Sequence, residues 1–251
     1  MKEGISIKGQ VIDLHTHILP EMDDGSDSLH TSAEMLHAFG EENVDVICAT
    51  PHYFRSRESI ARFVERRAAA AELFAGLYTP EKEEQYPQIL LGAETAFFFG
   101  ISECEDLDAL CIEGTKTLLL EMPFRKWSST EISEVLSLKL DRGLKVILAH
   151  PERYEFCDSN RKMLQKMMNL PMGIQVNADI LLSLWSRRQG LRLLREAAWP
   201  LLGSDAHNMQ ERRPRLAEGR KVIAHRLGTT FLEEMDENTA WLLGIQEEDG
   251  T

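Results

Sequence analysis

The sequence predicts one α/β domain, spanning residues 1–251, in which seven parallel strands form a distorted TIM-like (β/α)7 barrel. Short apolar runs alternate with helical patterns along the whole chain, and no linker, repeat or low-complexity segment separates them. This alternation is typical of a parallel sheet with helices outside it. A closed barrel of eight strand–helix units needs about 250 residues, and this chain has 251. Because we count only seven strands, we expect a distorted barrel of seven units.

The predicted strands are apolar runs that end at polar or turn-forming residues. They cover residues 11–14, 44–49, 89–94, 117–121, 145–149, 173–176 and 201–203. Between them, apolar residues recur at the spacing of an amphipathic helix. Helices are therefore expected at residues 28–39, 59–77, 131–140, 161–169, 187–198, 214–227 and 238–243, with a polar loop at 79–87.

The composition is that of an ordinary globular protein with an acidic surface. Hydrophobic residues make up 43% of the chain and charged residues 27%, both common values. The net charge of −13 argues against nucleic-acid binding and against binding to an anionic membrane. No apolar run opens the chain or approaches a membrane span, so we expect no signal peptide and no membrane insertion. The four scattered cysteines suggest reduced thiols in the cytoplasm.

Residues that can bind metal ions follow six of the seven predicted strands. His15 and His17 are two residues apart, so on a strand both would point to the same face. In parallel α/β barrels the active site lies at the carboxyl ends of the strands, and we expect these residues to meet there. The candidates are His15, His17, Asp24 or its neighbour Asp23, His52, Glu94, Glu121, His150, Asp205 and His207.

This set of imidazoles and carboxylates, without a thiolate, suits Mn²⁺, Fe or Zn²⁺ and not a cysteine-based structural zinc site. Nine candidates are too many for one ion, so we expect two or three. Sites with several metals activate water and hold the oxygens of a transferred phosphoryl group. Arg153 and Arg212 lie close to these candidates in the sequence and could bind a phosphate, although Arg153 could instead pair with Glu152 or Glu155.

Six segments carry a more specific signal. They are Asp13-Leu14-His15-Thr16-His17, Asp23-Asp24-Gly25, Thr50-Pro51-His52, Gly92-Ala93-Glu94, Ala149-His150-Pro151-Glu152-Arg153-Tyr154 and Ser204-Asp205-Ala206-His207-Asn208. Together they resemble the PHP (polymerase and histidinol phosphatase) family. The most similar branch is that of the bacterial metal-dependent protein-tyrosine phosphatases of capsular and exopolysaccharide synthesis. The resemblance extends from about residue 11 to residue 244.

The resemblance implies a PHP-type barrel with a trinuclear site, usually described with Mn²⁺. A metal-activated hydroxide would hydrolyse phosphotyrosine on the tail of a bacterial tyrosine kinase of polysaccharide synthesis. Arg153 and Arg212 would bind the phosphate, and His207 or a metal-bound water would assist the leaving phenolate. The three ions would be held by His15, His17, Glu94 and Asp205, by Glu94, Glu121 and His150, and by Asp24, His52 and His207.

Other functions agree with parts of the same pattern. Alternatives within the family are a histidinol-phosphate phosphatase and a nuclease, although the acidic charge argues against a nuclease. A barrel that binds a kinase tail without catalysis is another, but all nine ligand positions are filled. A metal-dependent amidohydrolase is a third, in which the group of Asp24, His52 and His207 has no evident role.

Four details stay open in the sequence. Asp13 is expected to orient a histidine from outside the metal site. The segment 97–99 (Phe-Phe-Phe) forms either a wall for an aryl phosphate or part of the core. Arg213 follows Arg212 directly, so either could face the phosphate. A homo-oligomer is compatible with the sequence.

Overall fold

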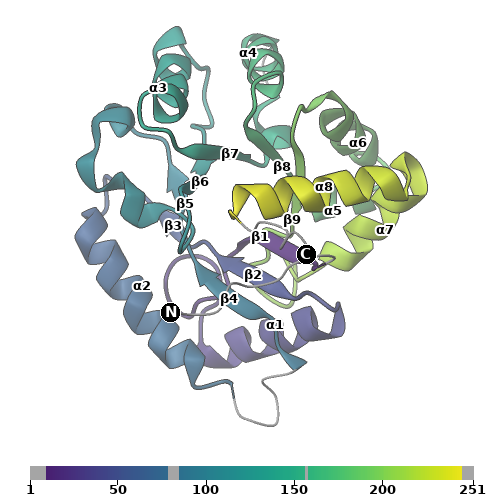
Figure 1. The fold of residues 1–251 in the computed structure, drawn as a ribbon. Helices are drawn as coiled ribbons and strands as arrows, with labels where there is room; N and C mark the ends of the chain where they lie inside the picture. Colours follow the sequence, from purple (N-terminus) through teal and green to yellow (C-terminus); the bar gives the residue numbers. More distant parts are fainter. Residues whose placement is uncertain (1–9, 79–84, 156–157, 245–251) are drawn as a thin grey trace, which may run out of the picture.

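Short parallel strands form the centre of the molecule, and helices surround them (Figure 1). The computed structural model describes residues 10–78, 85–155 and 158–244, so most of the loop expected at 79–87 lies outside the described residues. Most of the strands are buried on both faces, as expected for parallel strands covered by helices. They are β1 (Ile12–Thr16), β2 (Val46–Ala49), β3 (His52–Tyr53), β4 (Gln88–Leu91), β5 (Glu94–Ala96), β6 (Thr117–Glu121), β7 (Lys145–Ala149), β8 (Gly173–Asn177) and β9 (Pro200–Gly203).

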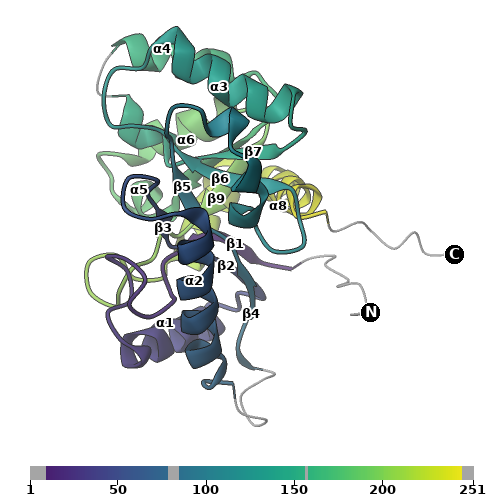
Figure 2. The same cartoon turned by 90° about the vertical axis from the view of Figure 1, so that its left-hand side faces the viewer.

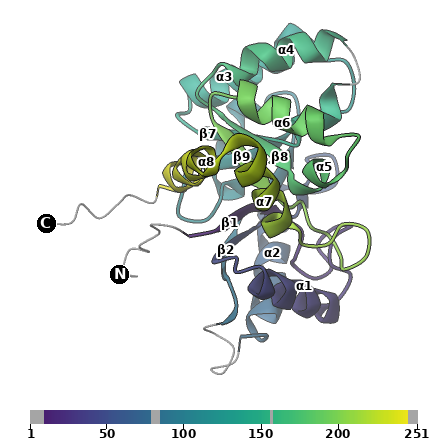
Figure 3. The same cartoon turned by 90° about the vertical axis from the view of Figure 1, so that its right-hand side faces the viewer.

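Helices α1 and α2 lie on one side of the strands, and α3, α4 and α6 lie on the other (Figures 2 and 3). Ser28, Ser59 and Ser128 each cap a helix by accepting a backbone N–H of its first turn, which is why these helices begin there. The α-helices are α1 (Leu29–Glu41), α2 (Ile60–Ala75), α3 (Ser129–Leu140), α4 (Asp158–Met168), α5 (Ala178–Leu182), α6 (Arg187–Glu196), α7 (Leu216–Leu227) and α8 (Thr229–Leu242).

The seven predicted strands are present, but two of them are broken. The second continues as β3 after Thr50-Pro51, and the third divides into β4 and β5 at Gly92-Ala93. Pro51 has no N–H to donate to a neighbouring strand, which explains the first break. Gly92 lies so close to its neighbours that an added Cβ would be 3.2 Å from the Thr50 side chain, so the two breaks lie beside each other.

The breaks divide the strands into two sheets, with the orders β1-β2-β4 and β3-β5-β6-β7-β8-β9. Regular strand pairing does not join these sheets into one closed ladder. Backbone hydrogen bonds connect the far edges instead, since Asp205 N donates to His15 O and His17 N to Ala206 O, each at 2.8 Å. The prediction of a distorted parallel barrel is confirmed, and the distortion lies at the two broken strands.

A small apolar cluster fills the ring of strands. It joins alternate residues of β1, β2 and β7, together with Leu119 of β6 and Leu201 of β9, to Leu242 and Leu243 at the end of α8. The α8 backbone also receives hydrogen bonds from the amino ends of two strands, because Thr117 and Lys145 donate to Leu242 O and Trp241 O. Helix α8, which packs on α7 and β9 (Figure 3), therefore closes the amino end of the barrel. The polar residues are left for the carboxyl end.

Two helices differ from the prediction. Helix α8 begins at Thr229, whereas only residues 238–243 were expected to be helical. Gly228 ends α7 with a φ of 101°, and a run of acidic residues masks the apolar spacing of the first turns of α8. Helix α5 was not predicted at all, because its five residues are too few to show a periodic pattern.

In the described part of the chain no helix is long and apolar enough to cross a membrane. Among the described residues, Cys48, Cys104 and Cys111 form no disulfide. Cys157 lies outside the described residues.

Candidate metal centre

The candidate ligands meet at the carboxyl end of the barrel. Three groups of them have side-chain nitrogen or oxygen atoms that all lie within 4.8 Å of one another. Asp24 forms a fourth such group with Asp23 and His52, and His150 joins the cluster through Glu94. The three groups are His15, His17, Glu94 and Asp205; His17, His52 and His207; and His52, Glu94 and Glu121.

Glu94 lies at the centre of the cluster and is fully buried. Its Oε2 atom is 3.1 Å from His15 Nε2, 3.3 Å from His17 Nε2 and 2.9 Å from His52 Nδ1. Its Oε1 atom is 2.7 Å from His150 Nε2. Burial alone would raise the pKa of Glu94, but the charge of His15 and hydrogen bonds from the histidines hold this pKa well below its usual range. Glu94 is therefore a carboxylate that four imidazoles share.

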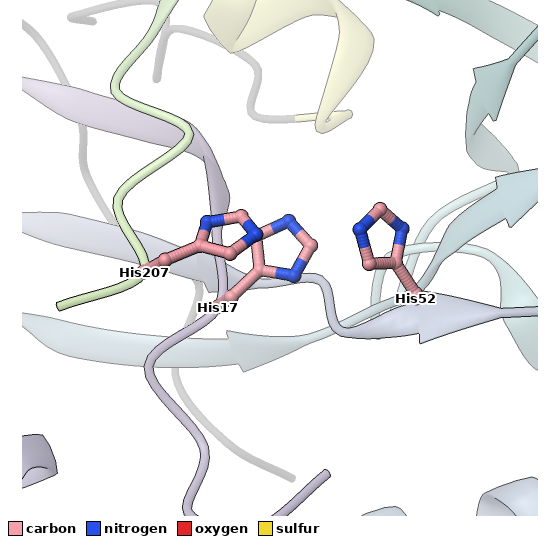
Figure 4. A group of neighbouring side chains, drawn as sticks. All are labelled: His17, His52 and His207. Atoms are coloured by element: carbon pink, nitrogen blue, oxygen red, sulfur yellow. The ribbon is translucent and has the colours of Figure 1, made fainter. Parts of the chain in front are cut away.

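Three histidines donate from Nδ1 to an oxygen atom, which turns Nε2 toward the cluster. His17 Nδ1 donates to Asp23 Oδ2 at 2.7 Å, His15 Nδ1 to Gln175 Oε1 at 2.9 Å, and His207 Nδ1 to Asp205 O at 2.9 Å. With Nδ1 held as the donor, Nε2 can offer its lone pair to a metal ion once any proton on Nε2 has left, which is how proteins prepare histidine for a metal ion. Figure 4 shows the ring of His17 between those of His52 and His207, with centroids 4.6 and 3.8 Å away.

Several buried polar atoms that face the cluster lie close to other candidate ligands but make no well-oriented hydrogen bond among the described residues. They include Glu94 Oε2, Asp205 Oδ1, His52 Nδ1 and His207 Nε2. A buried polar atom without a partner costs free energy, and each of these atoms can act as a metal ligand. The donors are nitrogen and oxygen alone, which suits Mn²⁺, Fe or Zn²⁺. The residues of this site therefore fit bound divalent ions.

Glu121 adds a second carboxylate beside Glu94. Its Oε1 atom is 3.5 Å from His150 Nε2. Burial, and then the negative charge of Glu94, raise the pKa of Glu121 to about 7. A divalent cation between the two carboxylates would remove this repulsion.

The neighbours Asp23 and Asp24 make different contacts. Asp23 accepts hydrogen bonds from the His17 ring, from His52 N at 2.6 Å and from Gly25 N at 2.9 Å, so it orients two histidines and shapes the turn. Asp24 is 68% exposed, and its Oδ1 is 3.5 Å from His52 Nε2 and 3.8 Å from His207 Nε2. Asp24 therefore lies at the open edge of the cluster.

A polar chain on β8 was missed by the sequence analysis. Gln175 holds the His15 ring and donates to Asn177 Oδ1 at 2.8 Å, while Asn177 Nδ2 donates to Asp205 Oδ2 at 2.7 Å. β8 was the one predicted strand without a candidate ligand at its end. Gln175 and Asn177 are two residues apart, the same spacing as His15 and His17, and this spacing is a signal that could have revealed them.

Asp13 differs from its expected role. Its carboxylate accepts hydrogen bonds from the backbone N–H groups of His15 and Ser204, at 3.1 and 3.0 Å, and burial raises its pKa to about 6. It therefore ties β1 to the segment after β9. The partner of His15 Nδ1 is Gln175, not Asp13.

Both predicted phosphate-binding arginines reach the same carboxylate. Arg153 Nη2 and Arg212 Nη2 each lie 2.6 Å from Asp205 Oδ2. The alternative pairing of Arg153 with Glu152 or Glu155 is not what the structure shows. Arg213 instead lies 3.6 Å from Glu218 and is exposed, so of the two neighbours Arg212 faces the cluster.

The backbone at two candidate ligands is strained. His150 and Asp205 have φ angles of 33° and 54°, in the left-handed region that residues with a Cβ seldom adopt. Such strain often occurs at functional sites, where the surrounding structure maintains it.

Comparison with known proteins identifies the family. Residues 11–243 match the family model described as "Capsular polysaccharide synthesis, CpsB/CapC". This chain belongs to the CpsB/CapC family. It is 28% identical over 242 residues to the tyrosine-protein phosphatase YwqE of Bacillus subtilis, with 94% of this chain and 92% of YwqE covered. It is 26% identical over 231 residues to the tyrosine-protein phosphatase CpsB of Streptococcus agalactiae, with 87% and 91% covered.

A solved structure agrees with CpsB/CapC membership. The fold matches a chain from the crystal structures of YwqE from Bacillus subtilis and CpsB from Streptococcus pneumoniae, described as unique metal-dependent tyrosine phosphatases. The TM-score is 0.80 at 28% identity, with 94% of this chain and 95% of that chain covered. The resemblance to capsular tyrosine phosphatases seen in the sequence is thereby confirmed.

Proposed function

We propose that this chain, as one domain over residues 1–251, is a metal-dependent protein-tyrosine phosphatase that hydrolyses phosphotyrosine. The observation that carries this proposal is a buried cluster of imidazoles and carboxylates with two arginines at its edge. The CpsB/CapC relatives, which are named as tyrosine-protein phosphatases, support the same conclusion.

The metal ligands are also part of the proposal. One ion would be held by His15, His17, Glu94 and Asp205, a second by Glu94, Glu121 and His150, and a third by Asp24, His52 and His207. Mn²⁺ is the proposed metal, with Fe or Zn²⁺ as alternatives that the same donors accept. When bound, the ions would activate water and offset the charge of the phosphoryl group.

The two arginines would hold the phosphate. One guanidinium group can bind two phosphate oxygens at once. The guanidinium groups of Arg153 and Arg212 both contact the same oxygen of Asp205. An incoming phosphate would compete with Asp205 for both groups. Because Asp205 approaches His15 and His17 with its other oxygen, at 3.4 Å, the bound phosphate would lie next to the metal ligands.

His207 is proposed as a metal ligand whose ring is neutral. Burial, together with the positive charge of His17, lowers the pKa of His207 to about 2, so the ring is neutral at physiological pH. A phenol has a pKa of about 10, so a departing phenolate needs less help from an acid than an alkoxide does. His207, as a ligand of the third ion, or a metal-bound water would supply the help that is needed.

The cellular substrate proposed here is the phosphotyrosine-bearing tail of a bacterial tyrosine kinase in the cytoplasm. The family's description as part of capsular polysaccharide synthesis supports this choice. The histidinol-phosphate phosphatase, the nuclease and the non-catalytic binder remain the alternatives that an experiment must separate.

The test is phosphate release from a phosphotyrosine peptide by metal-stripped protein, with and without added Mn²⁺, and by His15→Ala with the same metal. We expect release from the wild type after Mn²⁺ is added and none from the variant. Parallel rates on histidinol phosphate and single-stranded DNA distinguish the other enzymes. Bound metal without release from any substrate would contradict catalysis and support the binding role.

A further inference from the structure

A phenyl ring borders the ligand cluster without belonging to it. Phe124 follows β6, three residues after Glu121, and its side chain is 55% exposed. Its ring lies nearly parallel to that of His150, with an angle of 15° and 6.1 Å between centroids. It also packs at 5.5 Å from the ring of Tyr154. One part of this apolar ring therefore faces the cluster's edge and another part faces solvent.

The loop that carries Phe124 is held firmly. Met122 N donates to the buried Tyr154 hydroxyl at 3.0 Å, and the indole N–H of buried Trp127 donates to Pro123 O at 2.9 Å. Buried Asn160 then bonds the backbone at both Arg125 and Trp127, each at 2.9 Å. The ring of Phe124 is thus presented by a backbone that is hydrogen-bonded on both sides of it, so it needs little ordering when a ligand covers it.

Phe124 packs on the residue that follows one of the two arginines proposed to bind the phosphate. Tyr154, against which it packs, follows Arg153 directly in the short helix η4 (Pro151–Tyr154). Arg153 is one of the two arginines that would bind the phosphate. An ester group attached to that phosphate would therefore leave the site close to the turn on which Phe124 packs. Aromatic rings attract each other at centroid distances of about 4.5–7 Å, so the leaving tyrosyl ring would find a suitable partner there.

The other aromatic residues near the site are less suitable. Phe97 and Phe98 are partly buried against the main core, so the wall suggested for residues 97–99 is not formed by them. Phe99 is 62% exposed, but its contacts are with Phe97 and the Arg125 guanidinium. Phe54 lies beside His52, yet the guanidinium of Arg57 covers its ring at 4.2 Å.

We propose that Phe124 is the specificity-determining residue of this site, forming the wall against which the aryl ring of phosphotyrosine packs. A phosphoserine or phosphothreonine side chain has no ring and gains nothing from this contact. The wall therefore favours aryl over alkyl phosphomonoesters.

This inference rests on the phosphatase function proposed above, and it concerns the choice of substrate and not the chemical step.

The test compares Phe124→Ala, Phe124→Tyr and the control Phe99→Ala in the Mn²⁺-loaded protein. Two peptides are used that differ only in carrying phosphotyrosine or phosphoserine. For Phe124→Ala we expect kcat/KM on phosphotyrosine to fall roughly tenfold and the phosphoserine rate to stay within about twofold of wild type. Phe124→Tyr keeps an aromatic ring at this position and should retain the preference for phosphotyrosine over phosphoserine. Phe99→Ala should behave as wild type. Equal losses on both peptides would mean that Phe124 only supports His150, and would overturn the proposal.

Binding provides a readout that does not depend on turnover. Dissociation constants for phenylphosphonate and methylphosphonate are measured on the same variants by calorimetry. We expect Phe124→Ala to weaken phenylphosphonate roughly tenfold while methylphosphonate binding stays unchanged. Unchanged phenylphosphonate binding, or no preference for it in the wild type, would overturn the proposal. If the wild type releases no phosphate from phosphotyrosine, the phosphatase function fails, and the phosphonates still decide whether Phe124 is an aryl wall.

Discussion

Asp23→Asn is the substitution that best separates orientation of the ligands from metal binding itself. The Asp23 carboxylate does not face the centre of the cluster. It accepts hydrogen bonds from the His17 ring and from His52 N through Oδ2, and from Gly25 N through Oδ1. Burial would raise the pKa of Asp23, but the charge and hydrogen bond of His17 lower it, so the carboxylate is ionised when it holds the ring.

Asparagine has the same shape but replaces one acceptor with an NH₂ donor. If the amide nitrogen faces Gly25, one hydrogen bond is lost and a buried N–H is left unpaired, which costs about 1–3 kcal/mol. If it faces His17 instead, the ring must accept at Nδ1 and carry its proton on Nε2, where it cannot bind metal. Either outcome predicts metal affinity lower by roughly 10- to 100-fold, or about 1.4–2.7 kcal/mol.

The measurement is a calorimetric titration of Mn²⁺ into metal-stripped protein. Glu21→Gln is the matched control, because it removes one negative charge from the same loop at an exposed side chain. Thermal unfolding without metal establishes that both variants fold. If Asp23→Asn binds Mn²⁺ within about threefold of wild type and no more weakly than Glu21→Gln, orientation by Asp23 is not required and the reasoning is refuted.

Four further substitutions, one of them a control, test single parts of the site. His150→Ala removes the nitrogen 2.7 Å from Glu94 and should lower phosphotyrosine turnover by about 100-fold or more with an unchanged circular dichroism spectrum; near-normal activity would contradict its role as a ligand. Arg212→Ala should raise KM roughly tenfold while Arg213→Ala changes it less than about twofold, and the reverse order would show that the wrong arginine was chosen. In Gly25→Ala the new Cβ would lie 2.4 Å from His17 Cβ, so the ring must move and kcat/KM should fall by about 100-fold; wild-type kinetics would show that the turn has room to adjust.

The arrangement of the site limits the cost of burying its polar residues. The amino end is closed by apolar residues of α8, while the carboxyl end holds the ligands together with neutral partners such as Gln175 and Asn177. These amides fix the rings and carboxylates without adding charge. A change that affects only the amides should therefore alter metal binding more than folding.

The sequence alone determined the fold class, most of the helices and the kinds of residue at the site. These are local properties, since the periods of strands and helices repeat within a few residues. The last residues of every barrel strand also lie at the carboxyl end of the barrel, whichever strands are its neighbours. Even the histidine pair at 15 and 17 needs only the period of a strand. The ends of β1, β6 and β7 could therefore be recognised without any knowledge of the neighbouring elements.

The tertiary structure alone decided between adjacent residues of the same type. Asp23 holds the His17 ring while Asp24 lies at the open edge of the cluster, and Arg212 reaches Asp205 while Arg213 reaches Glu218. The two members of each pair have the same side chain and are adjacent in the chain, so no sequence pattern separates them. Backbone angles and packing against distant segments set the direction of each side chain. The same reason applies to Phe124, whose place beside His150 arises only when two loops far apart in sequence are brought together.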